Sequence, residues 1–333
     1  MNPFSSRTLK QTAAQRLSAS SYSPRKLIAL HTGLSLAVTL AISLLSYILS
    51  HQINSTGGLS GIGLRAILTT VQSGLQLGAI VALPFWEIGF VRAALSMGRN
   101  QPAGPSTLLS GFRRFGPVLR LMLLLAMLFS ILMLLCVYMG TGIFMMTPAA
   151  APYVEAMMPL IESLSSLNPE LALDEAMVAT LTKTLMPAYL ISAVLFAAVS
   201  IPLFYRLRMA SFAIMDDQRV GAFFAVVKSW KLTKRHCMGL FRLDLSFWWF
   251  YGLQLLLTAL AYLDMILPAL GIALPQNAFL WLILLQAVGQ LALYWWAGSY
   301  VQTSYAVAYD SLQASAQLPA VPAGPKHQPW DYS

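Results

Sequence analysis

Charged residues are scarce in this chain. Asp, Glu, Lys and Arg together make up 10% of its 333 residues, whereas a soluble domain carries about 25%. Hydrophobic residues make up 57%. A chain with so little polar surface does not suit a water-facing globule. The composition therefore favours a protein whose surface mostly faces lipid.

Residues that carry chemistry are also scarce. The chain has two cysteines, Cys136 and Cys237, and four scattered histidines, so neither a disulfide nor a metal site is expected. No HExxH, Walker A or CxxC motif occurs in the sequence. We therefore predict a protein that is not an enzyme and that binds no cofactor.

Six long apolar runs dominate what is present. A helix needs about 20 apolar residues to cross the hydrocarbon core of a bilayer, and every run meets that length. The runs cover residues 27–49, 67–91, 118–146, 185–204, 245–267 and 279–307. We predict an all-α, polytopic membrane protein with six transmembrane helices. Its membrane domain spans 27–309, between a basic cytoplasmic tail at 1–26 and a disordered cytoplasmic tail at 310–333.

Basic residues fall almost entirely on one side of these runs. Nineteen of the 21 Lys and Arg residues lie in segments on the same side, and only Arg65 and Lys183 lie on the other. Cytoplasmic loops carry the Lys and Arg excess, so we predict that both termini lie inside. The outer loop at 147–184 holds five acids against Lys183, and its pattern predicts a small helical extracytoplasmic cap. The net charge of +9 then faces anionic lipid, and no nucleic acid is expected as a partner.

A cytoplasmic amphipathic helix is predicted before the fifth run, within residues 216–242. Its apolar stripe comprises Phe223, Val227 and Trp230, and its basic stripe comprises Lys228, Lys231 and Arg235. This pattern is typical of a helix that lies on anionic lipid at the inner membrane interface. The competing interpretation packs the aromatic stripe against other helix ends of the same protein.

Acidic side chains are nearly absent from the runs. Only Glu87 and Asp264 place a carboxylate inside one, and an intramembrane acid is a candidate site. Glu87 could serve as a proton or cation relay, or it could form a structural pair with Arg206 or Arg208 at the inner end of the fourth run. We favour the structural pair.

The sixth run is polar along one face. Gln286, Gln290 and Tyr294 recur there at intervals of four residues. Polar side chains are costly in lipid, so this face is expected to point into the bundle or a wet cavity.

Residues 229–247 read SWKLTKRHCMGLFRLDLSF. This stretch resembles the signature of an uncharacterised family of bacterial integral membrane proteins, a basic-Leu-x-Lys stretch followed by Leu-Phe-x-Leu-Asp-Leu-Ser-Phe. Arg235 stands where that signature usually has Gly. Residues 84–116 and 205–216 look similar to the same family. The resemblance implies a bacterial plasma-membrane protein with a six-helix plan, and it brings no known activity, substrate or active site.

Asp244 and Ser246 of this motif also have a physical interpretation. They stand where the fifth membrane helix is expected to begin, and a carboxylate there accepts hydrogen bonds from the unpaired N–H groups of the first turn. We therefore predict that the motif is a hinge between the interfacial helix and the membrane helix rather than a binding site.

Two functions are open at this point. The favoured one is a non-enzymatic scaffold, assembly or envelope-associated role, with the lipid bilayer, other membrane proteins or a second copy of the chain as partners. The alternative is a transporter or channel for a small solute or ion, with Glu87 and the Gln286–Gln290–Tyr294 face lining a path.

Overall fold

The computed structural model describes residues 5–20, 23–55, 61–165, 175–263 and 278–316. These residues form helices joined by turns, and no β-strand occurs among them. They divide into two compact units, Met1–Met122 with Leu207–Ser333, and Leu123–Arg206. The predicted all-α fold is confirmed for the described residues.

Among the described residues, four helices are long and apolar enough to cross a membrane. They cover Pro24–Ser46, Ala66–Gly98, Phe115–Met145 and Leu181–Asp216. A fifth span results if Cys237–Leu245 and Trp248–Leu260, which are bent by 67° at a short break, cross as one. Six spans and cytoplasmic termini stay predictions, and Asp264 lies outside the described residues.

Large apolar side chains point outward from these helices. Leu134, Leu190 and Leu255 are 69%, 65% and 72% exposed. Exposed apolar surface costs about 25 cal/mol per Å² in water, so surfaces of this kind suit contact with lipid tails.

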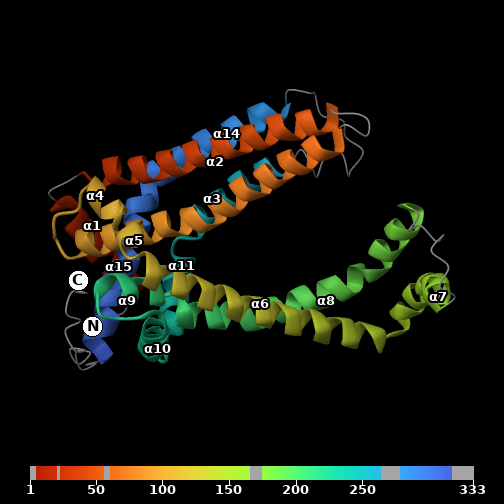
Figure 1. Ribbon diagram of the computed structural model, residues 1–333. Helices are drawn as coiled ribbons and strands as arrows, with labels where there is room; N and C mark the ends of the chain where they lie inside the picture. Colours follow the sequence, from red (N-terminus) through yellow and green to blue (C-terminus); the bar gives the residue numbers. More distant parts are fainter. Residues whose placement is uncertain (1–4, 21–22, 56–60, 166–174, 264–277, 317–333) are drawn as a thin grey trace, which may run out of the picture. The chain divides into compact units, whose positions relative to one another are not determined.

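The first unit holds most of the helices (Figure 1). In chain order they are α1 (Ser6–Ser18), α2 (Pro24–Ser55), α3 (Gly61–Gly98), α4 (Pro105–Leu108), α5 (Ser110–Arg113), the start of α6 (Phe115–Met145), α9 (Ala210–Asp216), α10 (Ala222–Thr233), α11 (Cys237–Leu245), α12 (Trp248–Ala261), α14 (Ala278–Leu293), the π-helical turn η2 (Tyr294–Gly298) and α15 (Ser299–Ala316). Helices α2, α3 and α14 run side by side, and α15 continues from η2 to contact α1 and α3 (Figure 1).

The predicted basic tail contains a docked helix, α1. The Ser5 side chain caps it by accepting a hydrogen bond from the Thr8 amide, and Leu9 and Ala13 are buried. The Lys10 ammonium donates to the Ser246 carbonyl at 3.0 Å and lies 4.3 Å from the centroid of the Phe247 ring. Helix α1 is therefore packed against the protein, neither disordered nor lying free on lipid.

The C-terminal boundary of the membrane domain also differs from the prediction. Helix α15 continues to Ala316, so residues 310–316 are helical rather than part of a disordered tail. Leu312 in this extension and Tyr309 just before it are fully buried, and that packing holds the helix beyond the apolar run. The rest of the predicted tail, 317–333, lies outside the described residues.

The second unit is a helical hairpin with a small cap. It comprises α6 from Leu123, the 3₁₀ turn η1 (Pro148–Ala150), α7 (Ala151–Ser165) and α8 (Glu175–Leu207) as far as Arg206. A buried cluster of Phe144, Ala150 and Ala188 joins them. Helix α7 belongs to the predicted helical cap, and residues 166–174 of that loop lie outside the described residues.

Two glycines bring backbone against backbone in the first unit. A Cβ atom on Gly89 of α3 would lie 1.8 Å from the Leu108 carbonyl oxygen of α4. A Cβ atom on Gly111 of α5 would lie 1.9 Å from the Phe85 carbonyl oxygen of α3. Because backbone atoms cannot give way as a flexible side chain can, only glycine fits at both positions.

We expect Gly89→Ala to destabilise the protein by about 1–3 kcal/mol, the usual cost of forcing extra atoms into a packed site. Thermal unfolding in mild detergent measures the loss. Gly116→Ala is the matched control, because a Cβ there has no neighbour within 4 Å and alanine favours a helix more than glycine does. Equal unfolding temperatures for Gly89→Ala and the parent chain would contradict the close contact.

Candidate functional site

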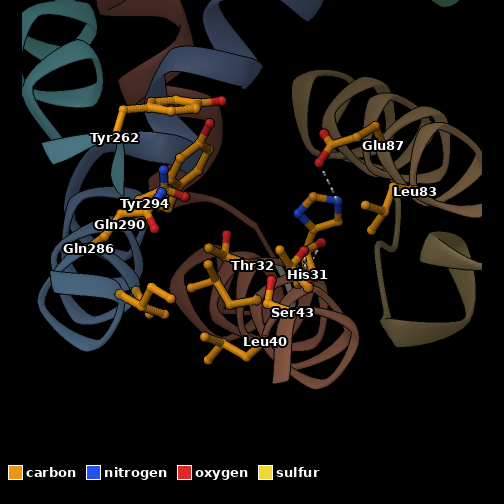
Figure 2. A pocket seen from close by; sticks show the side chains of 15 residues that line it. His31, Thr32, Leu40, Ser43, Leu83, Glu87, Tyr262, Gln286, Gln290 and Tyr294 are labelled. Atoms are coloured by element: carbon orange, nitrogen blue, oxygen red, sulfur yellow. Dashed lines mark hydrogen bonds and ion pairs between the residues drawn. The ribbon is translucent and has the colours of Figure 1, made fainter. Parts of the chain in front are cut away.

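A cavity of about 520 Å³ lies in the first unit between α2, α3, α14 and the end of α12. Figure 2 shows its lining side chains converging from these helices. They are His31, Thr32, Ser35, Leu36, Thr39, Leu40, Ser43, Leu83, Glu87, Tyr262, Ile283, Gln286, Ala287, Gln290 and Tyr294. Pockets for small molecules typically measure about 300–1,000 Å³, so the cavity is large enough to bind one.

Two polar stripes line this cavity. His31, Ser35, Thr39 and Ser43 follow at intervals of four along α2, which places them on one face of the helix. Gln286, Gln290 and Tyr294 form the second stripe on α14 and η2 (Figure 2). The polar face predicted for the sixth run therefore lines a cavity.

His31 is the most unusual residue of the cavity. Its imidazole is stacked on the Trp86 ring, with centroids 5.5 Å apart, and on the Phe90 ring at 4.5 Å. The residue is only 3% exposed, yet neither ring nitrogen has a hydrogen-bond partner among the described residues. The Thr32 hydroxyl, in a residue 6% exposed, is in the same situation. Leaving a buried polar group unsatisfied costs about 1–3 kcal/mol, so these groups are suited to accept hydrogen bonds from, or donate them to, a ligand or water in the cavity.

Glu87 of α3 and His31 of α2 lie next to each other in the cavity lining (Figure 2). Its carboxylate oxygen lies 3.7 Å from His31 Nε2, which is an ion-pair distance but too long for a hydrogen bond. The structural pair predicted with Arg208 is wrong, because the Arg208 guanidinium contacts Asp244. Arg206 lies in the last turn of α8, in the second unit.

Asp244 belongs to a closed hydrogen-bonded ring. Its carboxylate pairs with Arg208 and accepts a hydrogen bond from the Tyr305 hydroxyl. The Tyr305 hydroxyl is 2.5 Å from the Tyr251 hydroxyl, which accepts from Arg208 at 3.3 Å. The predicted capping role of Asp244 is wrong, because the residue lies in the last turn of α11 and not at the start of a helix.

Ser246 lies at the bend between α11 and α12, where the hinge was predicted. It is the C-terminal cap of α11, and its hydroxyl donates to the Leu243 carbonyl at 2.7 Å. The α11–α12 break bends the chain by 67°. The ring around Asp244 ties this bend to α15 through Tyr305 and to the chain just before α9 through Arg208.

A second charged cluster is centred on Arg99, just beyond the end of α3. Its guanidinium pairs with Asp310 of α15 at 2.6 Å and with Asp216 of α9 at 2.5 Å. Burial alone would lower the pKa of Arg99, but hydrogen bonds and charge attraction from both carboxylates outweigh it and raise the pKa. Arg16 of α1 lies 3.8 Å from Asp310, and Tyr309 donates to Asp216. The cluster is a structural tie between α1, α9, α15 and the chain just after α3.

The predicted amphipathic helix corresponds to α10, with a different division of its faces. Ala225, Ser229 and Leu232 are buried against the protein, whereas Phe223 and Trp230 are 64% and 45% exposed. Val227 is half-buried. Lys228 turns inward, 3.9 Å from Asp216 and 5.7 Å from the centroid of the Tyr309 ring. Lys231 and Arg235 remain exposed.

A family model described as Protein of unknown function (DUF975) matches residues 1–316. The chain belongs to this family. The predicted resemblance to an uncharacterised family is thus confirmed. No curated protein and no solved structure matches the chain. Members of DUF975 have no assigned activity. The geometry of the site is therefore the basis for a function of this DUF975 chain.

The polar stripe of α2 is the part of the site that the sequence prediction missed. The i, i+4 repeat of His31, Ser35, Thr39 and Ser43 is visible in the sequence, and the same criterion identified the stripe of α14. Among the described residues no three His, Cys, Asp or Glu side chains come together to hold a metal ion. That this DUF975 protein binds no cofactor stays a prediction.

We expect Asp244→Asn to destabilise this DUF975 protein by about 3–5 kcal/mol, because it leaves the buried Arg208 guanidinium without its countercharge. Thermal unfolding in detergent measures the loss. Ser246→Ala removes only a local hydrogen bond and should cost about 1 kcal/mol or less.

A paired replacement tests the structural role of the ring. Asp244→Leu combined with Arg208→Met removes both charges, and apolar replacement of a buried ion pair is often nearly neutral. The double variant should be clearly more stable than Asp244→Asn. A double variant that is no more stable would contradict the purely structural role of this pair.

Proposed function

We propose that this protein is a carrier for a small polar solute in the plasma membrane of a bacterium, and that the solute binds in the cavity between α2, α3 and α14. The observation that carries the proposal is the buried imidazole of His31, neither nitrogen of which has a hydrogen-bond partner among the described residues. An unpaired polar group in a membrane helix favours a ligand or a water-filled path.

The solute forms hydrogen bonds rather than apolar contacts. Seven of the lining side chains on α2, α14 and η2 offer a hydroxyl, amide or imidazole group, and Thr32 adds an eighth. These groups form two rows on facing helices, so a bound molecule can be held from both sides and passed along the rows. An assembly or scaffold role alone does not account for such a lining. That the protein is not an enzyme stays a prediction.

The carrier proposal predicts that a cysteine on the α2 stripe reacts with a water-soluble reagent. In a chain whose Cys136 and Cys237 are replaced by Ala, we expect Thr39→Cys to be modified by a charged methanethiosulfonate at least about tenfold faster than Val38→Cys. Val38 is 39% exposed on the neighbouring face, where lipid suppresses the thiolate that reacts.

The side of the membrane from which the reagent reaches the cavity distinguishes a carrier from a binding protein that does not transport. A carrier opens its cavity to each side in turn, so Thr39→Cys should be modified in both right-side-out and inside-out vesicles. Modification from one side only would contradict transport. Equal rates for Thr39→Cys and Val38→Cys would contradict a wet cavity altogether.

A second role, at the inner membrane surface, is supported by α10. Phe223 and Phe224 are each 64% exposed, beside Trp230, and Lys231, Lys234 and Arg235 are exposed close by in sequence. We propose that these six residues, the α10 surface, bind anionic lipid headgroups and anchor the protein at the inner leaflet. Each basic residue near such a surface contributes about 1 kcal/mol.

We expect a variant with Lys231, Lys234 and Arg235 changed to Gln to retain less phosphatidylglycerol after mild detergent extraction, measured by lipid mass spectrometry. The control changes Arg7, Arg25 and Lys26 to Gln, which removes the same charge from exposed positions near the N-terminus. Equal lipid loss in both variants would show that net charge, not the α10 surface, attracts the lipid.

A further inference from the structure

The charges around the cavity identify the class of solute. Of the fifteen described residues that line it, Glu87 alone carries an acidic side chain, and none is Lys or Arg. When His31 is neutral and Glu87 is ionised, the described lining of the cavity therefore holds one uncompensated negative charge. In a medium of low dielectric constant such a charge requires a countercharge.

The cations described on the neighbouring helices do not provide that countercharge. On α3 itself, Arg92 donates to the Met215 carbonyl at 2.9 Å, and Arg99 pairs with Asp216 and Asp310. On α1, Lys10 and Arg16 donate to the Ser246 and Gly98 carbonyls. On α5 and just after it, Arg113 is exposed and Arg114 donates to carbonyls at the end of α9.

Three titratable side chains face Glu87 from the other elements around the cavity. They are His31 of α2, Tyr294 of η2 and Tyr262 at the end of α12 (Figure 2). A phenol side chain brings no positive charge, and the Tyr294 hydroxyl accepts a hydrogen bond from Gln254 at 3.1 Å. The site thus has room for one positive charge, brought either by a proton or by a solute.

We propose that Glu87 binds either a proton or the positive group of an organic cation, so that protons and solute compete for the cavity. The proposal rests on the proposed carrier function. The Glu87 side chain is 60% exposed, against 4% for His31, so an incoming cation can reach the carboxylate. A cavity of about 520 Å³ is far larger than a bare metal ion needs, which favours an organic cation. The Tyr262 and Tyr294 rings suit it, because aromatic faces attract ammonium groups.

The exchange conserves charge. When the cation arrives, the O–H bond of the protonated Glu87 carboxyl breaks and the proton leaves to water, while the carboxylate pairs with the cation. The cavity is neutral before and after the step. Solute leaving on the other side of the membrane allows Glu87 to take up a proton again, which couples solute movement to a proton moving in the opposite direction.

Choline and its uncharged isostere 3,3-dimethylbutan-1-ol test this proposal on the purified full-length protein. Choline carries no exchangeable ammonium proton, so any proton released to a weakly buffered solution comes from the protein. We expect choline to release up to about one proton per chain. Its affinity, measured by thermal shift, should fall by up to about tenfold per pH unit at acidic pH. The isostere should show neither effect.

Two variants locate the exchange. Glu87→Gln should abolish the proton release and the pH dependence, and Glu155→Gln, which alters an exposed acid, should keep both. If Glu87→Gln does not fold, the comparison of choline with its isostere on the parent chain still decides. Proton release that persists in Glu87→Gln would overturn the assignment to this residue.

The outcomes separate this inference from the carrier proposal. Equal, pH-independent behaviour of choline and its isostere, or binding of neither, overturns the cation–proton exchange. In that case Thr39→Cys accessibility from both sides would still support a carrier for an uncharged solute. If Thr39→Cys is also unreactive, the carrier proposal fails with it.

Discussion

The Arg99 guanidinium holds the first unit together where its helices end. One planar, permanently charged group satisfies carboxylates from α9 and α15, and α1 reaches the same cluster through Arg16. Apolar helices slide easily past one another in lipid, since lipid tails are as apolar as their side chains. Directional charge pairing at the helix ends supplies the register that the apolar surfaces cannot, and the cavity between α2, α3 and α14 depends on that register.

Polar groups in this structure fall into two kinds. Around Asp244, every partner in the ring of Arg208, Tyr251 and Tyr305 donates to or accepts from the next. Around His31, two nitrogens and the Thr32 hydroxyl are buried without a hydrogen-bond partner among the described residues. A satisfied ring has nothing left to offer a ligand, whereas an unsatisfied group does. This contrast supports the proposal that the cavity, and not the signature motif, binds a ligand.

The sequence predicted what depends on local pattern. Apolar runs located the long helices, and the spacing of Gln286, Gln290 and Tyr294 identified a polar face that lines the cavity. The partners of charged residues could not be predicted. Asp244 was expected to cap a helix because it directly precedes an apolar run. In the structure it lies before the bend between α11 and α12 and contacts Arg208 and Tyr305, and sequence pattern does not reveal such tertiary contacts. Glu87 was assigned an arginine because sequence position alone does not show that α2 brings His31 beside it. The faces of α10 were assigned by hydrophobicity, yet its small residues, Ala225 and Ser229, pack inward.

The π-helical turn at Tyr294–Gly298 divides one continuous helical segment into a part that lines the cavity and a part that packs against the charged clusters. Residues eleven apart lie almost on the same face of an ideal α-helix, so Tyr305 would otherwise stand below Tyr294. A π turn inserts an extra residue and rotates everything after it by about a quarter turn or slightly more. The segment before the turn can therefore face the cavity while the segment after it faces the Asp244 ring and the Arg99 cluster. If the cavity binds a solute as proposed, substitutions before the turn would alter the cavity lining without altering the contacts that anchor the helix after the turn.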